Sequence, residues 1–233
     1  RRPPRSTLFP YTTRFRSALT VSGSIGDVGL GFGLTKTGTG TLILSGNNTY
    51  SGGTTLANGI VNVANAGALG ATGNITFTGG ALQFSSANTV DYSSRIVSSS
   101  SVIAIDTNSQ NVTFANTLVA SNNGGLTKNG AGTLTLGGTN LYSGTTTVNA
   151  GTLDIIGNSA GIGATVNVNG GALQIGTGGS INSSTALTLG SGTSSGLFVL
   201  GDSSNAVNQT VASMVTSGTG TANAIVGGGA AGI

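Results

Sequence analysis

Short stretches of alternating apolar and polar residues recur along the chain, separated by runs rich in glycine, asparagine and threonine. Side chains two residues apart share one face of a strand, so each stretch presents its leucines or valines to one side. Glycine and asparagine between them accept the backbone conformations of tight corners. The 3.6-residue spacing of helices is nearly absent. The pattern therefore predicts an all-β protein with short strands over residues 41–44, 54–56, 60–63, 81–84 and 133–136.

One long segment occurs twice. Residues 33–63 read GLTKTGTGTLILSGNNTYSGGTTLANGIVNV and residues 125–155 read GLTKNGAGTLTLGGTNLYSGTTTVNAGTLDI, with 17 of 31 positions identical and no gap. The similarity continues, because residues 76–84 match residues 167–175 after a deletion of one residue. Self-similarity over such a distance is typical of repeat architectures.

Short strands broken by glycine could form a sandwich, a barrel or a solenoid. A solenoid is favoured by the long continuous repeat, by corners rich in threonine, asparagine and glycine, and by the lack of charged outer faces. Coils of roughly 20–24 residues would give about nine or ten rungs over residues 18–233. Equivalent asparagines or threonines in stacked rungs could then form side-chain ladders.

The repeated motif closely resembles the passenger-associated transport repeat of bacterial autotransporters, the type V secretion proteins. Flanking phrases at 112–118 and 218–228 are similar to the same adhesin-like proteins. The residues that carry the structural repeat motif are Gly33, Leu34, Thr35, Lys36, Gly38, Gly40, Thr41, Leu42, Leu44, Tyr50, Ser51 and Gly52, and in the second copy Gly125, Leu126, Thr127, Lys128, Gly130, Gly132, Thr133, Leu134, Leu136, Tyr142, Ser143 and Gly144.

The resemblance implies a right-handed parallel β-helix that forms an adhesin-like shaft at the cell surface. It also implies export through a C-terminal outer-membrane β-barrel, which would be the main partner and the anchor of the full-length protein. Ligands on host or neighbouring cells would be further partners. The repeat is expected to assist folding of the passenger during export.

The opening RRPPRSTLFPYTTRFRS differs from everything after it and contains five of the eight basic residues. It resembles translated sequencing-adapter sequence, so we expect residues 1–17 to be foreign or disordered and residues 18–233 to be the passenger fragment, with the true N-terminus missing. Without the opening segment the chain is faintly acidic and has no stripe of lysine or arginine to neutralise phosphates, which argues against nucleic-acid binding. No apolar run is long enough for a transmembrane helix.

Candidate chemistry is sparse. Gly192–Gly196 fits the nucleophile pattern G-x-S-x-G, but the chain contains no histidine to act as the base. Gly29–Gly33 is rich in glycine but lacks the spacing of a dinucleotide loop. The five aspartates are dispersed and cysteine is absent, so we expect no catalytic, cofactor or metal site.

Two alternatives keep the same scaffold. A polysaccharide-acting enzyme would need Asp91, Arg95 and Asp106 on one concave face, although a surface ion pair between Arg95 and an aspartate is the simpler expectation. A carbohydrate-binding passenger would expose Tyr50 and Tyr142 together. The simpler expectation for these tyrosines is packing at a corner, with the hydroxyl bonded to backbone.

Overall fold

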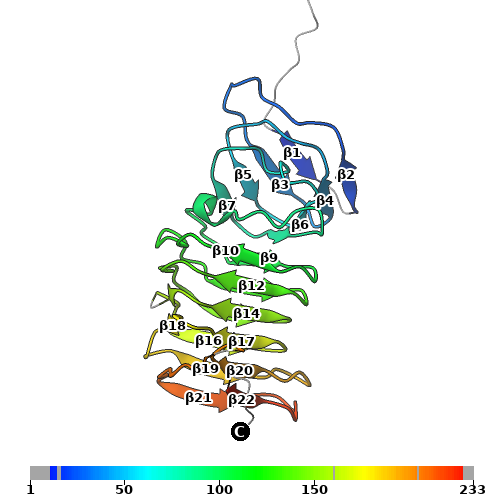
Figure 1. The fold of residues 1–233 in the computed structure, drawn as a ribbon. Helices are drawn as coiled ribbons and strands as arrows, with labels where there is room; N and C mark the ends of the chain where they lie inside the picture. Colours follow the sequence, from blue (N-terminus) through cyan, green and yellow to red (C-terminus); the bar gives the residue numbers. More distant parts are fainter. Residues whose placement is uncertain (1–10, 15–16, 160, 204, 228–233) are drawn as a thin grey trace, which may run out of the picture.

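The computed structural model describes residues 11–14, 17–159, 161–203 and 205–227. The described part is a column of stacked coils, with its first and last described strands at opposite ends of the column (Figure 1). Every pairing between its named strands is parallel. The predicted β-solenoid is therefore confirmed.

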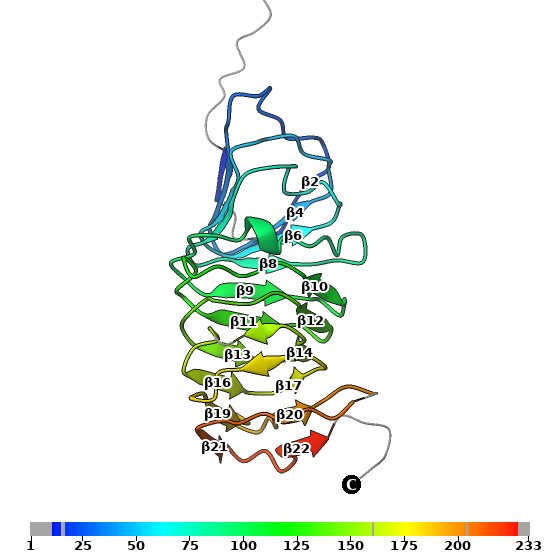
Figure 2. The ribbon, with the colours of Figure 1, turned by 60° about the vertical axis from the view of Figure 1, so that its left-hand side comes forward.

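Two long sheets form faces of the column (Figure 2). The ten-stranded sheet has the order β2 (Leu19–Val21), β4 (Thr41–Leu44), β6 (Ile60–Val63), β8 (Ala81–Gln83), β9 (Ile103–Asp106), β11 (Leu126–Asn129), β13 (Thr146–Val148), β16 (Thr165–Val168), β19 (Ala186–Leu189) and β21 (Ser213–Thr216). The six-stranded sheet has the order β10 (Val112–Phe114), β12 (Thr133–Leu136), β14 (Thr152–Ile155), β17 (Ala172–Ile175), β20 (Leu197–Leu200) and β22 (Ala224–Gly227).

Two smaller sheets complete the fold. The four-stranded sheet contains β1 (Tyr11–Arg14), β3 (Leu34–Thr37), β5 (Thr54–Leu56) and β7 (Ile75–Phe77), and the two-stranded sheet contains β15 (Asn158–Ser159) and β18 (Ser180–Ile181). A single 3-10 turn, η1 (Ser93–Arg95), is the helical element of the described residues. Nothing in that part of the chain forms a helix that is long and apolar enough to cross a membrane.

The ten strands of the longest sheet agree with the nine or ten rungs expected. Coil length varies more than the sequence suggested. The step is 19 residues where Thr41 pairs with Ile60 and 27 residues where Leu197 pairs with Ala224. The longer steps lie toward the C-terminal end, where loops between strands lengthen without changing the register of the sheet.

The core is a continuous file of apolar side chains along the inside of the column. In β4 the burial alternates, with Leu42 and Leu44 fully buried, and β12 buries Leu134 and Leu136 in the same way. Burying a leucine or valine contributes about 1.5–3 kcal/mol, so the short strands depend on the coils above and below them for stability. Alternation thus identified the inward leucines of these two strands correctly.

The two repeat copies lie on different faces of the column. In the first copy, β3 belongs to the four-stranded sheet and β4 to the ten-stranded sheet, whereas their equivalents β11 and β12 belong to the ten-stranded and six-stranded sheets. The shift occurs near η1, after which β9 stacks directly on β8. The second copy is therefore turned by one face about the column axis relative to the first.

Part of the opening segment lies against the column. Strand β1 pairs in parallel with β3, from Tyr11↔Leu34 to Arg14↔Thr37. Residues 1–10 and 15–16 lie outside the described residues. The boundary between a foreign segment and the passenger at residue 17 stays a prediction.

Candidate functional site: the corners of the repeat

Each repeat copy buries a lysine inside the column. Lys36 lies on β3 and Lys128 on β11, in strands whose burial alternates inward and outward, and both side chains are fully buried. A buried lysine normally requires partners for its ammonium group, because an isolated charge in the interior is costly. The two residues are therefore the least expected members of the motif.

The ammonium groups are held by backbone carbonyls of two successive coils. Lys36 Nζ donates to the carbonyls of Thr37 (2.9 Å), Gly38 (2.7 Å) and Asn58 (3.1 Å). In the second copy Lys128 Nζ donates in the same way; its acceptors are the carbonyls of Asn129 (3.0 Å), Gly130 (2.7 Å) and Ala150 (3.1 Å). We call each arrangement a lysine clamp, because it ties the corner after one strand to the corner of the next coil.

Glycine makes the clamps possible. Gly59 and Gly151 have φ of 65° and 66°, in the left-handed region that favours glycine. A Cβ on Gly59 would collide with two backbone carbonyl oxygens, those of Gly38 and Gly40, so the corner has no room for a side chain. Burial lowers the pKa of Lys36, and it lowers the pKa of Lys128 to about 8, although the charge of Asp106 opposes the shift at Lys128. Each clamp thus places a buried amino group at a corner where only glycine fits.

The motif tyrosines pack inside the column. Tyr50 is 2% exposed and Tyr142 is fully buried, so the version of the carbohydrate-binding alternative that needs both exposed is wrong. Their hydroxyls bond threonine side chains, at 2.7 Å between Tyr50 and Thr54 and 2.9 Å between Tyr142 and Thr146. Corner packing is confirmed, but the expected backbone partner is wrong. Burial raises the pKa of Tyr50 to about 12, and the bond to Thr54 opposes that shift.

A buried asparagine precedes each tyrosine and connects neighbouring coils. Asn48 Oδ1 accepts from the Ile25 amide of the previous coil (2.8 Å), and its Nδ2 donates to the Ala68 carbonyl of the following coil (2.6 Å). Asn140 Oδ1 likewise accepts from the Leu118 amide (3.0 Å). The motif positions therefore supply hydrogen bonds between rungs as well as apolar core.

The outer side of the ten-stranded sheet carries the side-chain ladders expected of stacked rungs. Asn62 Nδ2 donates to Gln83 Oε1 (2.7 Å), and Gln83 Nε2 donates to Asp106 Oδ2 (2.8 Å). Farther along, Asn169 Nδ2 donates to Asn149 Oδ1 and Asn149 Nδ2 to Asn129 Oδ1, each at 2.8 Å. These bonds link side chains of successive coils.

Asp91 and Arg95, two of the three residues that a polysaccharide-acting enzyme would need, form hydrogen bonds with backbone groups. Arg95 was expected to form an ion pair; instead its guanidinium donates to the carbonyls of Leu69, Gly70, Thr72 and Gly73. Asp91 accepts from the amides of Ser93 (2.8 Å) and Ala115 (2.9 Å). A cavity of about 360 Å³ is lined by Asp91 and Arg95 but not by Asp106, which belongs to the outer ladder. The three side chains do not converge.

The other candidate motifs form turns. Ser191 and Ser194 bridge across the turn between β19 and β20, with Gly192 at φ 58°. In the glycine-rich loop at 29–33, the Gly29 amide donates to Asp27 Oδ1 (3.1 Å). Among residues whose placement is described, no group of three or more histidine, cysteine or acidic side chains could hold a metal.

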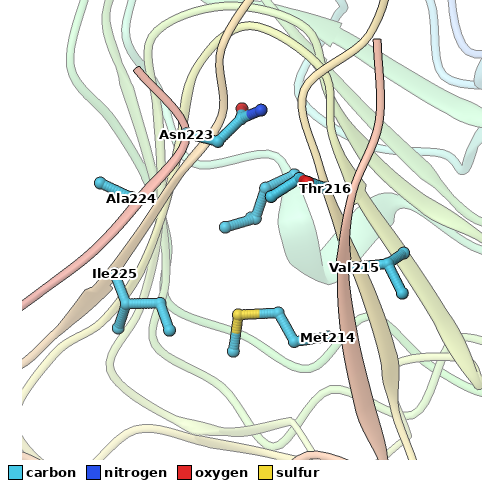
Figure 3. Close-up of a pocket in the computed structure, with 7 residues that line it drawn as sticks. Met214, Val215, Thr216, Asn223, Ala224 and Ile225 are labelled. Carbon is cyan, nitrogen blue, oxygen red and sulfur yellow. The ribbon is translucent and has the colours of Figure 1, made fainter. Parts of the chain in front are cut away.

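A second hollow, of about 430 Å³, lies at the C-terminal end between β21 and β22, where Met214 projects into the space (Figure 3). No described strand stacks beyond β21 or β22. The hollow is lined by Leu189, Met214, Val215, Thr216, Asn223, Ala224 and Ile225. None of these side chains is ionisable.

Comparison with known proteins agrees with the geometry of the repeat. The profile of the Passenger-associated-transport-repeat family matches residues 34–63 and 126–155, the two segments that contain the lysine clamps. The chain therefore carries two copies of the passenger-associated transport repeat. It is similar to the adhesin BmaC autotransporter of Brucella suis biovar 1 (strain 1330), with 34% identity over 201 residues. No solved structure matches the chain.

The chain is short beside this relative. The alignment covers 76% of the present chain and 6% of the relative, so the chain corresponds to a small part of a much longer protein. Within the two repeats, sequence reasoning found strands β4, β5, β6 and β12 but missed β3 and β11, and with them the inward direction of Lys36 and Lys128. The available signal was alternation, because Leu34 and Leu126 stand two residues before these lysines and point inward.

Proposed function

We propose that this passenger segment is a structural shaft of a surface-displayed autotransporter adhesin, and that its two repeats stabilise the shaft as it folds during export. The observation that carries the proposal is the direction of the side chains shared by the two copies. Inward positions keep their chemistry, as in the pairs Leu42/Leu134 and Tyr50/Tyr142, both buried. Outward positions are kept less fully: Thr35/Thr127 is identical, but Ile43/Thr135 and Ile60/Thr152 change from isoleucine to threonine.

A binding site repeated in both copies would be expected to keep its outward residues at least as fully as its inward ones. The turn of the second copy by one face adds to this argument, because equivalent outward positions point in different directions. Catalysis is disfavoured for a separate reason: Asp91 and Arg95 are bonded to backbone groups that hold the coils in place. The role of the segment is therefore structural and not enzymatic in this proposal.

The partners follow from the relative described as an autotransporter adhesin. The full-length protein would carry a C-terminal outer-membrane β-barrel as translocator, and the shaft would stand outside the outer membrane. Any ligand on a host or neighbouring cell would then be bound by the shaft or by parts of the longer protein beyond it.

The proposal can be tested by placing the whole chain between a signal peptide and an outer-membrane translocator barrel. Surface display is measured as loss of the passenger when protease is added to intact cells. The unmodified chain should be displayed, and Lys36→Met with Lys128→Met should lower display while the barrel still inserts. Thr35→Ser with Thr127→Ser is the matched control, since both threonines point outward on the same strands. Equal display of the lysine variant and the control would refute a role of the repeat in export.

A further inference from the structure

Four asparagines in this chain are followed by glycine: Asn58, Asn123, Asn129 and Asn169. At such a pair the glycine nitrogen can attack the asparagine carboxamide and close a five-membered imide. Two conditions favour this reaction. The carboxamide must lie against the following nitrogen, and the negative charge that develops when that nitrogen loses its proton must be stabilised.

Asn58 meets the first condition. The Gly59 amide donates to Asn58 Oδ1 at 2.7 Å, so the carboxamide lies directly against the nitrogen that would attack it. Asn58 is exposed, which gives water and hydroxide access to the pair. Holding two reacting groups in contact removes much of the entropic barrier to their reaction.

The lysine clamp of the first repeat meets the second condition. Lys36 Nζ donates to the carbonyl oxygen of Asn58 at 3.1 Å. When the Gly59 nitrogen loses its proton, peptide resonance shares the negative charge between this nitrogen and the Asn58 oxygen. A fixed ammonium group at that oxygen stabilises the charge as it forms.

We propose that Asn58–Gly59 is a self-modification site, at which Lys36 promotes conversion of the asparagine to aspartate and isoaspartate. Hydroxide removes the proton from the Gly59 nitrogen, and the nitrogen lone pair forms a bond to Cγ of Asn58. The bond between Cγ and the carboxamide nitrogen breaks, and that nitrogen leaves as ammonia after taking a proton from water. Water then opens the imide at either carbonyl, leaving a new carboxylate at the corner beside the Lys36 ammonium.

Two other asparagine–glycine pairs, at Asn129 and Asn169, lack one or both of these conditions and so serve as internal comparisons. Lys128 Nζ donates to the Asn129 carbonyl at 3.0 Å, but the Asn129 carboxamide is held in the outer ladder by Asn149. The Asn169 carboxamide is held in the ladder too, and the next amide, that of Gly170, donates to the Val148 carbonyl at 3.4 Å. Asn129 therefore has a lysine ammonium at its carbonyl, but its carboxamide is held away from the following nitrogen. Asn169 has neither the ammonium nor the contact.

The second lysine clamp provides a site at which to rebuild the reaction. Its equivalent pair is Ala150–Gly151, where Lys128 Nζ donates to the Ala150 carbonyl at 3.1 Å and Gly151 has φ of 66°. This corner has the ammonium and the backbone of the first copy but no carboxamide. Ala150→Asn should therefore create a second modification site.

The test is peptide mapping by mass spectrometry after the folded full chain has been incubated at neutral pH in heavy-oxygen water. The label distinguishes conversion during incubation from conversion during digestion. We expect Asn58 to convert about tenfold or more faster than Asn169, with Asn129 between them, and Ala150→Asn to convert at a rate close to that of Asn58. Equal rates at Asn58 and Asn169, or no conversion in Ala150→Asn, would overturn the proposal.

Lys36→Met tests the ammonium directly. With the fold intact by circular dichroism, conversion at Asn58 should fall about tenfold, while the matched Lys128→Met should leave Asn58 unchanged. An unchanged or faster rate in folded Lys36→Met would contradict the role of the ammonium. If Lys36→Met does not fold, the decision rests on Ala150→Asn, since that variant keeps the second lysine clamp and changes only a half-buried corner residue.

Discussion

Replacing Lys128 by methionine is the most direct test of the lysine clamp, because methionine keeps the apolar stem and removes the ammonium. The Asn129 carbonyl also accepts from the Thr107 amide, whereas Lys128 is the donor to the carbonyls of Gly130 and Ala150. Two charge-assisted bonds of about 1.5–3 kcal/mol each are lost, and part of this loss is offset because the ammonium no longer has to be desolvated. We expect a net loss of about 2 kcal/mol in the free energy of unfolding.

The assay is urea unfolding followed by far-UV circular dichroism, with hydrogen exchange to locate the change. Because each coil interacts mainly with its neighbours, faster exchange should be confined to the coils that contain β11 and β13. The control is Thr127→Ser, an outward change on the same strand. A Lys128→Met chain as stable as the unmodified chain would refute the reasoning, since the ammonium would then give no net stabilisation.

Three further predictions concern other buried polar groups. Tyr142→Phe should cost about 1 kcal/mol because the buried Thr146 hydroxyl loses its partner, and Tyr142→Phe combined with Thr146→Val should recover part of that cost in the same urea assay. Bonds from the Ser51 hydroxyl and amide hold the pKa of Asp27 at about 2, below its ordinary 3.8. The melting temperature should therefore fall as the pH drops from about 4 toward 2, and Asp27→Asn should make this fall smaller. Burial holds the pKa of Lys128 at about 8, below its ordinary 10.5, so the folded chain releases this proton at a lower pH than the unfolded chain does. The free energy of unfolding should therefore rise as the pH increases from about 8 toward 10.5, and Lys128→Met should abolish the rise.

The short strands could be predicted from the sequence because each follows from local alternation. Strands β5 and β6 begin and end at the predicted residues, and β8 ends one residue before the predicted end at Phe84. Strand β3 was missed, since a lysine at its centre argues against an inward position when only the segment itself is considered. Lysine is tolerated there because its apolar stem packs in the core while the ammonium reaches the corner.

The partners of the buried groups could not be predicted from local sequence. Lys36 is bonded to the carbonyl of Asn58, 22 residues away on the next coil, and Arg95 is bonded to carbonyls 22–26 residues before it. A carbonyl is present at every residue, so no side-chain type marks the acceptor. Only the coil length and the register determine which carbonyl lies within reach, and the coil length varies along the column.

The lysine clamp also explains why a repeat of this kind can recur on different faces of one column. Its acceptors are the corner after its own strand and the same corner one coil later, so the motif carries its contacts with it. It needs only a further coil of similar length beneath it, and both β3 and β11 step by 20 residues to the next strand. A motif that depends on the next coil and not on a particular face can stabilise a growing shaft wherever it occurs. This independence suits a segment that folds coil by coil during export, as proposed for this passenger.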